Sequence, residues 1–152
     1  MGGGQHLGDD HPAAGVSFEQ AVAYCAWYAA LSKKPFRLPT EWEWEFACRG
    51  ATRSRWFFGE DPAEGDRFVW HLGNSGDEAH PIEMLRANPA GLHDLLGNVW
   101  EWTTPEVGVA TTGVLRGGSF RTAMEEMGGS VRFVPEAGAT PDDVGFRIVR
   151  AL

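Results

Sequence analysis

A glutamate between two tryptophans is the position in the chain with the clearest demand for a chemical partner. Glu101 lies between Trp100 and Trp102 in a run rich in strand-forming residues. Because side chains alternate along a strand, the tryptophans face one side while Val99 and Glu101 face the other. A carboxylate held against aromatic surface is costly unless it is paired. We therefore expect Glu101 to have a specific polar partner.

The other residues able to do chemistry are scattered along the sequence. Cys25 and Cys48 fall in two predicted helices, and two cysteines are too few for a disulfide scaffold, so we expect buried thiols. The histidines lack the spacing of a metal site and are predicted to be structural. This applies to His71, His80 and His93, three of the five histidines in the chain.

Two helices are predicted near the N-terminus. The first runs from Phe18 to Leu31, with Ser17 and Gln20 as a capping box. The second follows the N-cap Thr40 and ends at Gly50. It carries three acidic residues, Glu41, Glu43 and Glu45. Successive residues two apart do not share a helix face, so we expect surface glutamates that complement the helix dipole rather than a metal cluster.

Short strands are predicted in the second half of the chain. They cover Val99–Trp102, Gly113–Phe120 and Val144–Leu152, and residues 51–89 are predicted to be mostly loop. Two helices followed by strands indicate an α+β domain. We expect an N-terminal extension or short edge strand over residues 1–15 and a single domain over residues 16–152.

Composition excludes several classes of function. The 152 residues carry a formal charge of −8 without a basic stripe, which argues against nucleic acid as a partner. No stretch resembles a signal peptide or a membrane span. These features favour a monomeric cytoplasmic protein, or one that reaches a virion or cell surface by another route.

Several motifs in one order resemble the family of formylglycine-generating enzymes, or sulfatase-modifying factors. They are Val16-Ser17-Phe18, Arg37-Leu38-Pro39-Thr40-Glu41, Gly73-Asn74-Ser75, Gly97-Asn98-Val99-Trp100-Glu101-Trp102, Arg116-Gly117-Gly118-Ser119 and Gly145-Phe146-Arg147. The resemblance implies a C-type lectin-like fold of the formylglycine-generating type, with two helices on a twisted, mostly antiparallel sheet and extensive loops.

The resemblance implies a copper-dependent oxidase only if two cysteine thiolates follow the Gly-Gly-Ser bend. Thr122 and Met127 stand at those positions, and neither can replace a thiolate ligand of copper(I). We therefore expect no copper and no catalytic residues. An oxidase or related sulfur-oxidising enzyme remains an alternative, as does a protein-interaction scaffold.

The chain also resembles the variable proteins of diversity-generating retroelements, which are non-catalytic ligand-binding members of this fold. In them the segment between the Gly-Gly-Ser and Gly-Phe-Arg motifs presents the binding face, here between Phe120 and Val144. The implied ligand is an unknown protein or small molecule. The candidate binding residues are Phe120, Arg121, Thr122, Ala123, Glu125, Val131, Phe133 and Val134. For Phe120, Val131, Phe133 and Val134 an equal alternative is a place in the core. Arg132 is predicted to be buried and to fix loop carbonyls.

The resemblance finally implies a structural calcium ion. Its ligands would be Asp94, the carbonyls of Gly97 and Val99, and Glu101, a set of oxygen donors that suits calcium. The alternative is that Glu101 accepts backbone hydrogen bonds or pairs with an arginine.

Overall fold

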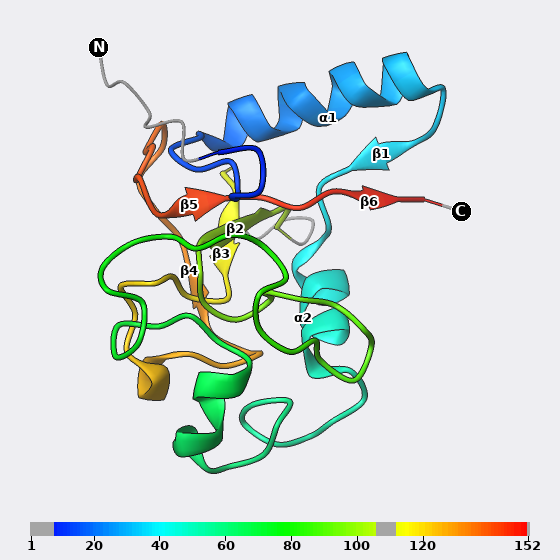
Figure 1. The fold of residues 1–152 in the computed structure, drawn as a ribbon. Helices are drawn as coiled ribbons and strands as arrows, with labels where there is room; N and C mark the ends of the chain where they lie inside the picture. Colours follow the sequence, from blue (N-terminus) through cyan, green and yellow to red (C-terminus); the bar gives the residue numbers. More distant parts are fainter. Residues whose placement is uncertain (1–7, 106–111, 152) are drawn as a thin grey trace.

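A computed structural model describes residues 8–105 and 112–151. Two helices accompany short strands, and long irregular loops join them (Figure 1). The elements are α1 (Phe18–Ser32), β1 (Phe36–Arg37), α2 (Glu41–Arg49), the 3-10 helix η1 (Pro62–Arg67), β2 (Trp100–Thr103), β3 (Val114–Arg116), the 3-10 helix η2 (Met124–Glu126), β4 (Arg132–Phe133), β5 (Val144–Gly145) and β6 (Val149–Arg150). Within the described residues, no helix is both long and apolar enough to cross a membrane.

Both predicted helices are confirmed, together with their caps. The Ser17 hydroxyl accepts from the amide of Gln20, whose side chain accepts in return from the amide of Ser17. Thr40 and Glu43 form the same capping box at the start of α2. Gly50 ends α2 in the left-handed conformation.

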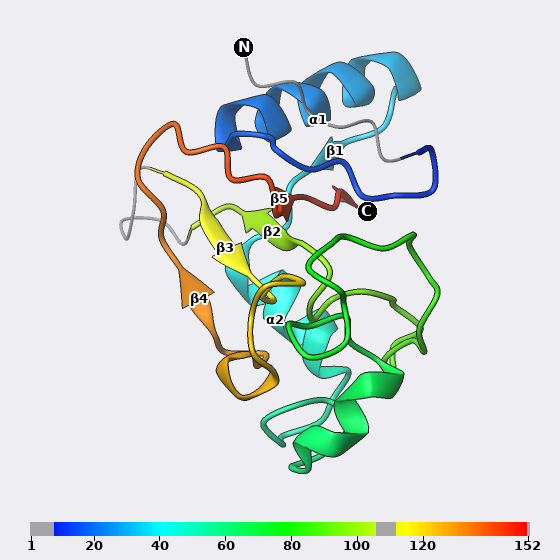
Figure 2. The same cartoon turned by 60° about the vertical axis from the view of Figure 1, so that its left-hand side comes forward.

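The strands form two small sheets. One has the order β4-β3-β2-β5, in which β2 runs antiparallel to β3 and parallel to β5. The other pairs β1 with β6 in antiparallel orientation. Three of these four strand pairs are antiparallel, so the α+β class and the mostly antiparallel sheet are confirmed. α1 lies along one outer side of the molecule, beyond β1, and α2 lies beside the strands (Figure 2).

The predicted strand over Val144–Leu152 is wrong as one continuous element, and Leu152 lies outside the described residues. The ladder with β2 ends at Gly145, and after three residues the chain pairs with β1 as β6. The alternation still placed Val144, Phe146 and Ile148 correctly on one apolar cluster. Alternation of apolar and polar residues indicates which side of a strand is buried, but it does not indicate which strand pairs with it.

The N-terminal stretch contributes one contact to the larger sheet region. Residues 1–7 of the expected extension lie outside the described residues, and the elements above include no strand in residues 8–15. The amide of Gly15 donates to the carbonyl of Val144, 3.0 Å away. The chain therefore contacts the first residue of β5 just before α1 begins.

Buried residues form separate clusters that the two helices help to fill. Trp44 and Cys48 of α2 lie in a cluster with Leu96 and Met127. Ala21 and Cys25 of α1 lie in another cluster, with Leu115, Trp102 and Val144. The two cysteines are consequently buried in different parts of the core, as free thiols.

Candidate functional site

Glu101 of β2 is buried and has the polar partner that the sequence demands. Arg147, in the connection between β5 and β6, donates to both carboxylate oxygens at 2.6 Å. The indole Nε1 of Trp44 donates to the same carboxylate at 2.7 Å. Arg147 also donates to the carbonyl of His93 at 3.0 Å. The alternative in which Glu101 pairs with an arginine is thus the arrangement found.

Of the four proposed calcium ligands, Asp94, Val99 and Glu101 line one cavity of about 380 Å³ together with Arg147, whereas Gly97 does not line it. The charge arrangement does not fit calcium, because the guanidinium of Arg147 already neutralises Glu101 and both carboxylate oxygens accept its hydrogen bonds. Asp94 Oδ2 accepts from the amide of Glu83 at 2.8 Å. The structure therefore favours an ion pair here, and calcium stays a prediction to be tested.

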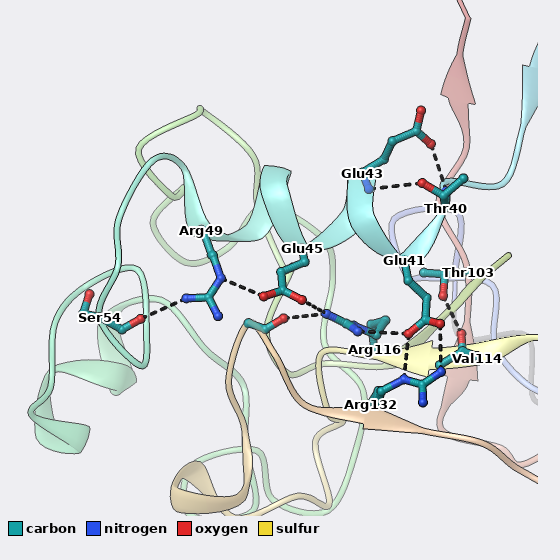
Figure 3. A network of polar contacts seen from close by, with 11 residues as sticks. Thr40, Glu41, Glu43, Glu45, Arg49, Ser54, Thr103, Val114, Arg116 and Arg132 are labelled. Atoms are coloured by element: carbon teal, nitrogen blue, oxygen red, sulfur yellow. Dashed lines mark hydrogen bonds and ion pairs between the residues drawn. The ribbon is translucent and has the colours of Figure 1, made fainter. Parts of the chain in front are cut away.

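A second polar network joins α2 to β3 and β4 (Figure 3). Arg116 of β3 donates to Glu41 at 3.1 Å and to Glu45 at 2.6 Å. Arg116 also donates to the carbonyl of Gly129 at 2.7 Å. Arg132 of β4 donates to both oxygens of Glu41 at 2.9 Å.

The prediction of surface glutamates on α2 is wrong for Glu41, which is buried, and for Glu45, which is bonded to Arg116 and Arg49. These two residues are four apart and therefore share a helix face, unlike successive residues two apart. The prediction that Arg132 is buried is also wrong. Its side chain is 42% exposed, and it donates to the Glu41 carboxylate.

The ion pairs change the acidity of the helix carboxylates. Burial raises the pKa of Glu41, but hydrogen bonds and charge from Arg132 and Arg116 outweigh it, so the net pKa is lowered. For Glu45 burial is likewise outweighed by Arg116 and Arg49. A hydrogen bond from Arg37, aided by the amide of Thr40, lowers the pKa of Glu43 to about 2. All three groups are therefore carboxylates at neutral pH.

The predicted binding residues do not form one continuous face. Phe120 is 4% exposed and packs with Val99, so for this residue the core alternative holds. Arg121 is exposed, lies 4.7 Å from the Phe120 ring centroid, and bonds to Asp77 and Asp142.

Ala123 and Glu125 line a cavity of about 520 Å³ together with Met124, Asp66 and His71. His71 Nε2 lies 2.8 Å from Asp66, and His71 Nδ1 accepts from the amide of Gly73. The ring is therefore a donor toward Asp66. This cavity could not be predicted from the sequence, because η1 and η2 come together only through the fold.

The remaining candidates lie at the other end of the segment. Phe133 of β4 and Val134 are about half exposed, and the Phe133 ring lies 6.2 Å from that of Trp100. Val131 is partly buried. The predicted face is thus divided between the η2 turn and the edge strand β4.

The histidines have the structural roles expected from their spacing. His80 stacks on Trp70, with ring centroids 3.8 Å apart, and its Nε2 lies 2.7 Å from the carbonyl of Ser75. His93 Nδ1 lies 2.9 Å from the carbonyl of Leu85. Within the described residues, no group of three or more histidine, cysteine or acidic side chains could hold a metal ion.

Residues 2–152 match the sulfatase-modifying factor enzyme 1-like domain. The chain belongs to this family. The mouse formylglycine-generating enzyme is 36% identical over 107 residues, which cover 62% of this chain and 27% of that protein. The bovine inactive C-alpha-formylglycine-generating enzyme 2 is 36% identical over 155 residues, covering 91% of this chain and 50% of that protein. The chain thus spans between about a quarter and a half of the length of these two relatives.

Solved structures confirm the lectin-like fold of this sulfatase-modifying factor domain. Treponema denticola variable protein 1 has a TM-score of 0.86 and 25% identity, over 91% of this chain and 70% of that one. PvdO from Pseudomonas aeruginosa has a TM-score of 0.83 and 23% identity, over 95% of this chain and 64% of that one, which shows the fold alone. The resemblance to variable proteins is therefore confirmed at the level of structure.

Thr122 and Met127 have structural roles in this sulfatase-modifying factor domain. The Thr122 hydroxyl accepts from the amide of Ser119 at 3.0 Å. Met127 is fully buried, and its carbonyl accepts from Trp56 Nε1 at 3.1 Å. Burial raises the pKa of the Cys48 thiol to about 12, and burial also raises the pKa of Cys25. Both cysteines are consequently thiols at neutral pH.

Proposed function

We propose that this domain is a non-catalytic ligand-binding domain of the variable-protein type, presenting a surface from the segment between Phe120 and Val144. The observation that carries the proposal is the environment of Thr122 and Met127, where the family resemblance places two copper-binding thiolates. A hydroxyl bonded to Ser119 and a fully buried thioether take their places. The two cysteines of the chain lie in different clusters of the core and cannot supply the pair.

The construction of the segment supports a binding role. Arg116, in the strand that precedes the segment, is bonded to α2, and Val144 at the end of the segment is paired with Trp100. Between these fixed points the segment exposes Arg121, Glu125 and Phe133. Exposed side chains on a loop whose ends are held rigidly are suited to recognition. The likeness to the Treponema denticola variable protein agrees with this role.

A copper(I) competition experiment tests the loss of catalysis. The protein is titrated into a chromogenic copper(I) chelator, and the absorbance of the chelator complex is followed. We expect the wild type to leave the absorbance unchanged, because its thiols are buried and protonated. A Thr122→Cys, Met127→Cys double variant is the positive control for thiolates at the family positions. Stoichiometric copper uptake by the wild type, together with oxygen consumption in the presence of a cysteine peptide, would establish the oxidase instead.

The coding sequence provides a test of diversification. We expect a second genomic copy of the region that encodes Leu115 to Leu152, differing from the first mainly at adenines. The differing codons should fall at exposed positions such as Arg121, Glu125 and Phe133 rather than at Met124 and Met127. If no such copy exists near the gene, a fixed interaction module becomes the better description of the domain.

A further inference from the structure

Helix α1 is apolar on nearly all of its sides, although most of it lies on the surface. From Ala21 to Leu31 the helix carries no charged residue, and only Ala21 and Cys25 are buried. Trp27 is 58% exposed and Leu31 is 64% exposed. A helix that is hydrophobic all round is normally covered, and large exposed apolar patches mark interaction sites. The outer side of α1 is therefore a candidate interaction surface.

Exposed and half-buried aromatic rings lie close together on α1 and beside it. The Tyr24 ring centroid lies 5.6 Å from that of Trp27, 6.1 Å from that of Tyr28 and 5.4 Å from that of Phe146. Tyr24, Trp27, Tyr28 and Leu31 recur at helical spacing, and with Phe146 they define what we name the α1 face. In Figure 1 the helix that carries four of these residues lies along the outside of the molecule.

A cavity continues the α1 face toward the N-terminal end of the helix. Its volume is about 600 Å³, and Val16, Gln20, Tyr24, Phe146 and Ile148 contribute to its lining. Gln20 and Tyr24 lie one turn apart on the same side of α1. The face thus has a hollow near its N-terminal end and a projecting apolar residue, Leu31, near its C-terminal end.

The charges at the two ends of α1 are opposite in sign. Glu19 is exposed in the first turn, whereas Lys33 and Lys34 are exposed directly after the last turn. Such a helix is self-complementary when two copies lie antiparallel, because the basic end of each then meets the acidic end of the other. An anionic lipid surface is less favoured as the occupant, since the chain carries a net charge of −8.

We propose that the α1 face binds a second copy of this chain, with the two α1 helices antiparallel about a two-fold axis close to Cys25. This register places Tyr24 opposite the partner's Trp27, and Gln20 opposite the partner's Leu31. The projecting leucine of each copy then fills the cavity beside Gln20 of the other. Lys33 lies near the partner's Glu19. The inference is independent of the proposed ligand-binding function, and it replaces the monomer that the composition favoured.

Sedimentation velocity with point variants tests the interface. We expect the wild type to sediment as a dimer, at twice the 16.6 kDa mass of the chain, at micromolar concentrations. Trp27→Glu should sediment as a monomer, because it buries a charge in the interface. Trp42→Glu is the matched control, since Trp42 is equally exposed but lies on α2, and it should remain a dimer.

Circular dichroism and thermal melting establish that each variant is folded, and Leu31→Glu provides a second interface variant. A wild type that is monomeric at every concentration would overturn the proposal, as would a folded Trp27→Glu protein that remains dimeric. Dissociation of the control Trp42→Glu alone would move the interface to α2, which contradicts the α1 register.

A charge exchange tests the antiparallel orientation. A Lys33→Glu, Lys34→Glu variant should weaken the dimer about tenfold or more, because the new glutamates approach the partner's Glu19. Adding Glu19→Lys to that variant should restore the affinity. Restoration would support the antiparallel register, and a further loss of affinity would exclude it.

Discussion

Two buried glutamates, Glu41 and Glu101, illustrate how single residues hold this fold together. Each accepts hydrogen bonds from an arginine that comes from a distant part of the sequence. The sequence indicated the demand for a partner at Glu101, because its aromatic neighbours are adjacent in the chain. For Glu41 the prediction of a surface position is wrong. Its partner Arg116 is distant in the sequence, so no neighbouring residue indicates that Glu41 is buried. Burial of a helix carboxylate is decided by packing, not by helix propensity.

Glu41→Ala should destabilise the protein by about 3 kcal/mol or more, because it leaves the buried guanidinium of Arg116 without one of its two carboxylates. The free energy of unfolding is measured by urea denaturation. Glu64→Ala is the control, since Glu64 belongs to an exposed pair with Arg67 and should change stability by only about 0.5 kcal/mol. Equal effects of the two variants would show that the Arg116 network contributes nothing specific.

Metal removal distinguishes the two interpretations of Glu101. Because Arg147 already neutralises this carboxylate, we expect a chelator to leave the melting temperature unchanged. The measurement is thermal denaturation before and after dialysis against chelator, and again with calcium restored. A melting temperature that falls in chelator and recovers with calcium, but not with magnesium, would show that the protein binds calcium and would contradict this expectation.

At the scale of elements, the sequence predicts correctly those features that depend only on neighbouring residues. The capping boxes of α1 and α2 lie within four consecutive residues, and both were predicted correctly. The break between β5 and β6 was missed, because it depends on which strand lies alongside each end of that segment. Pairing partners are distant in sequence, so alternation alone cannot identify them.

The backbone of Gly97 lies close to the backbone of Trp70, with which it forms a β-bridge. Its φ is +72°, and a Cβ there would lie 2.1 Å from the carbonyl oxygen of Trp70. Gly97→Ala should therefore cost several kcal/mol, combining left-handed strain of about 1–2 kcal/mol with a backbone clash. Gly138→Ala is the matched control, because Gly138 has a φ of +77° with nothing within 4 Å of the added Cβ. Urea denaturation of both variants separates the cost of the left-handed backbone from the cost of the clash with Trp70. Equal losses of unfolding free energy in the two variants would contradict the close contact between Gly97 and Trp70.

At the scale of the whole molecule, stability should fall on acidification. The folded state lowers the pKa of Glu43 from 4.5 to about 2, and it lowers the pKa of Glu41 and of Glu45. Folded-state pKa values below the unfolded ones mean that the unfolded chain binds more protons. The stabilisation is therefore complete above pH 4.5 and is lost as pH falls toward about 2. Urea midpoints across this range provide the measurement.

A Glu43→Gln variant is the control for the pH experiment. It should show a shallower loss of stability in acid, because it removes one of the shifted groups. An unchanged slope in this variant would mean that the Arg37 pair does not contribute.

The candidate site was predictable from the sequence only as a segment. Arg121, Glu125 and Phe133 of this segment are exposed, whereas Phe120, for which the sequence left the surface and the core equally open, is buried. The cavity beside Ala123 was missed, since its far wall comes from Asp66 and His71. Which residues face outward depends on the irregular path of the loop, and that path has no period from which it could be read.

The η2 turn interleaves two kinds of position, because Met124 and Met127 fill the core while Glu125 beside them is exposed. A combinatorial library built on this segment would therefore have to vary positions that are not consecutive in the sequence. Full randomisation of the segment would discard most clones through misfolding. A library should keep both methionines and vary only side chains that a target can contact. These are Arg121, Ala123, Glu125, Phe133 and Val134.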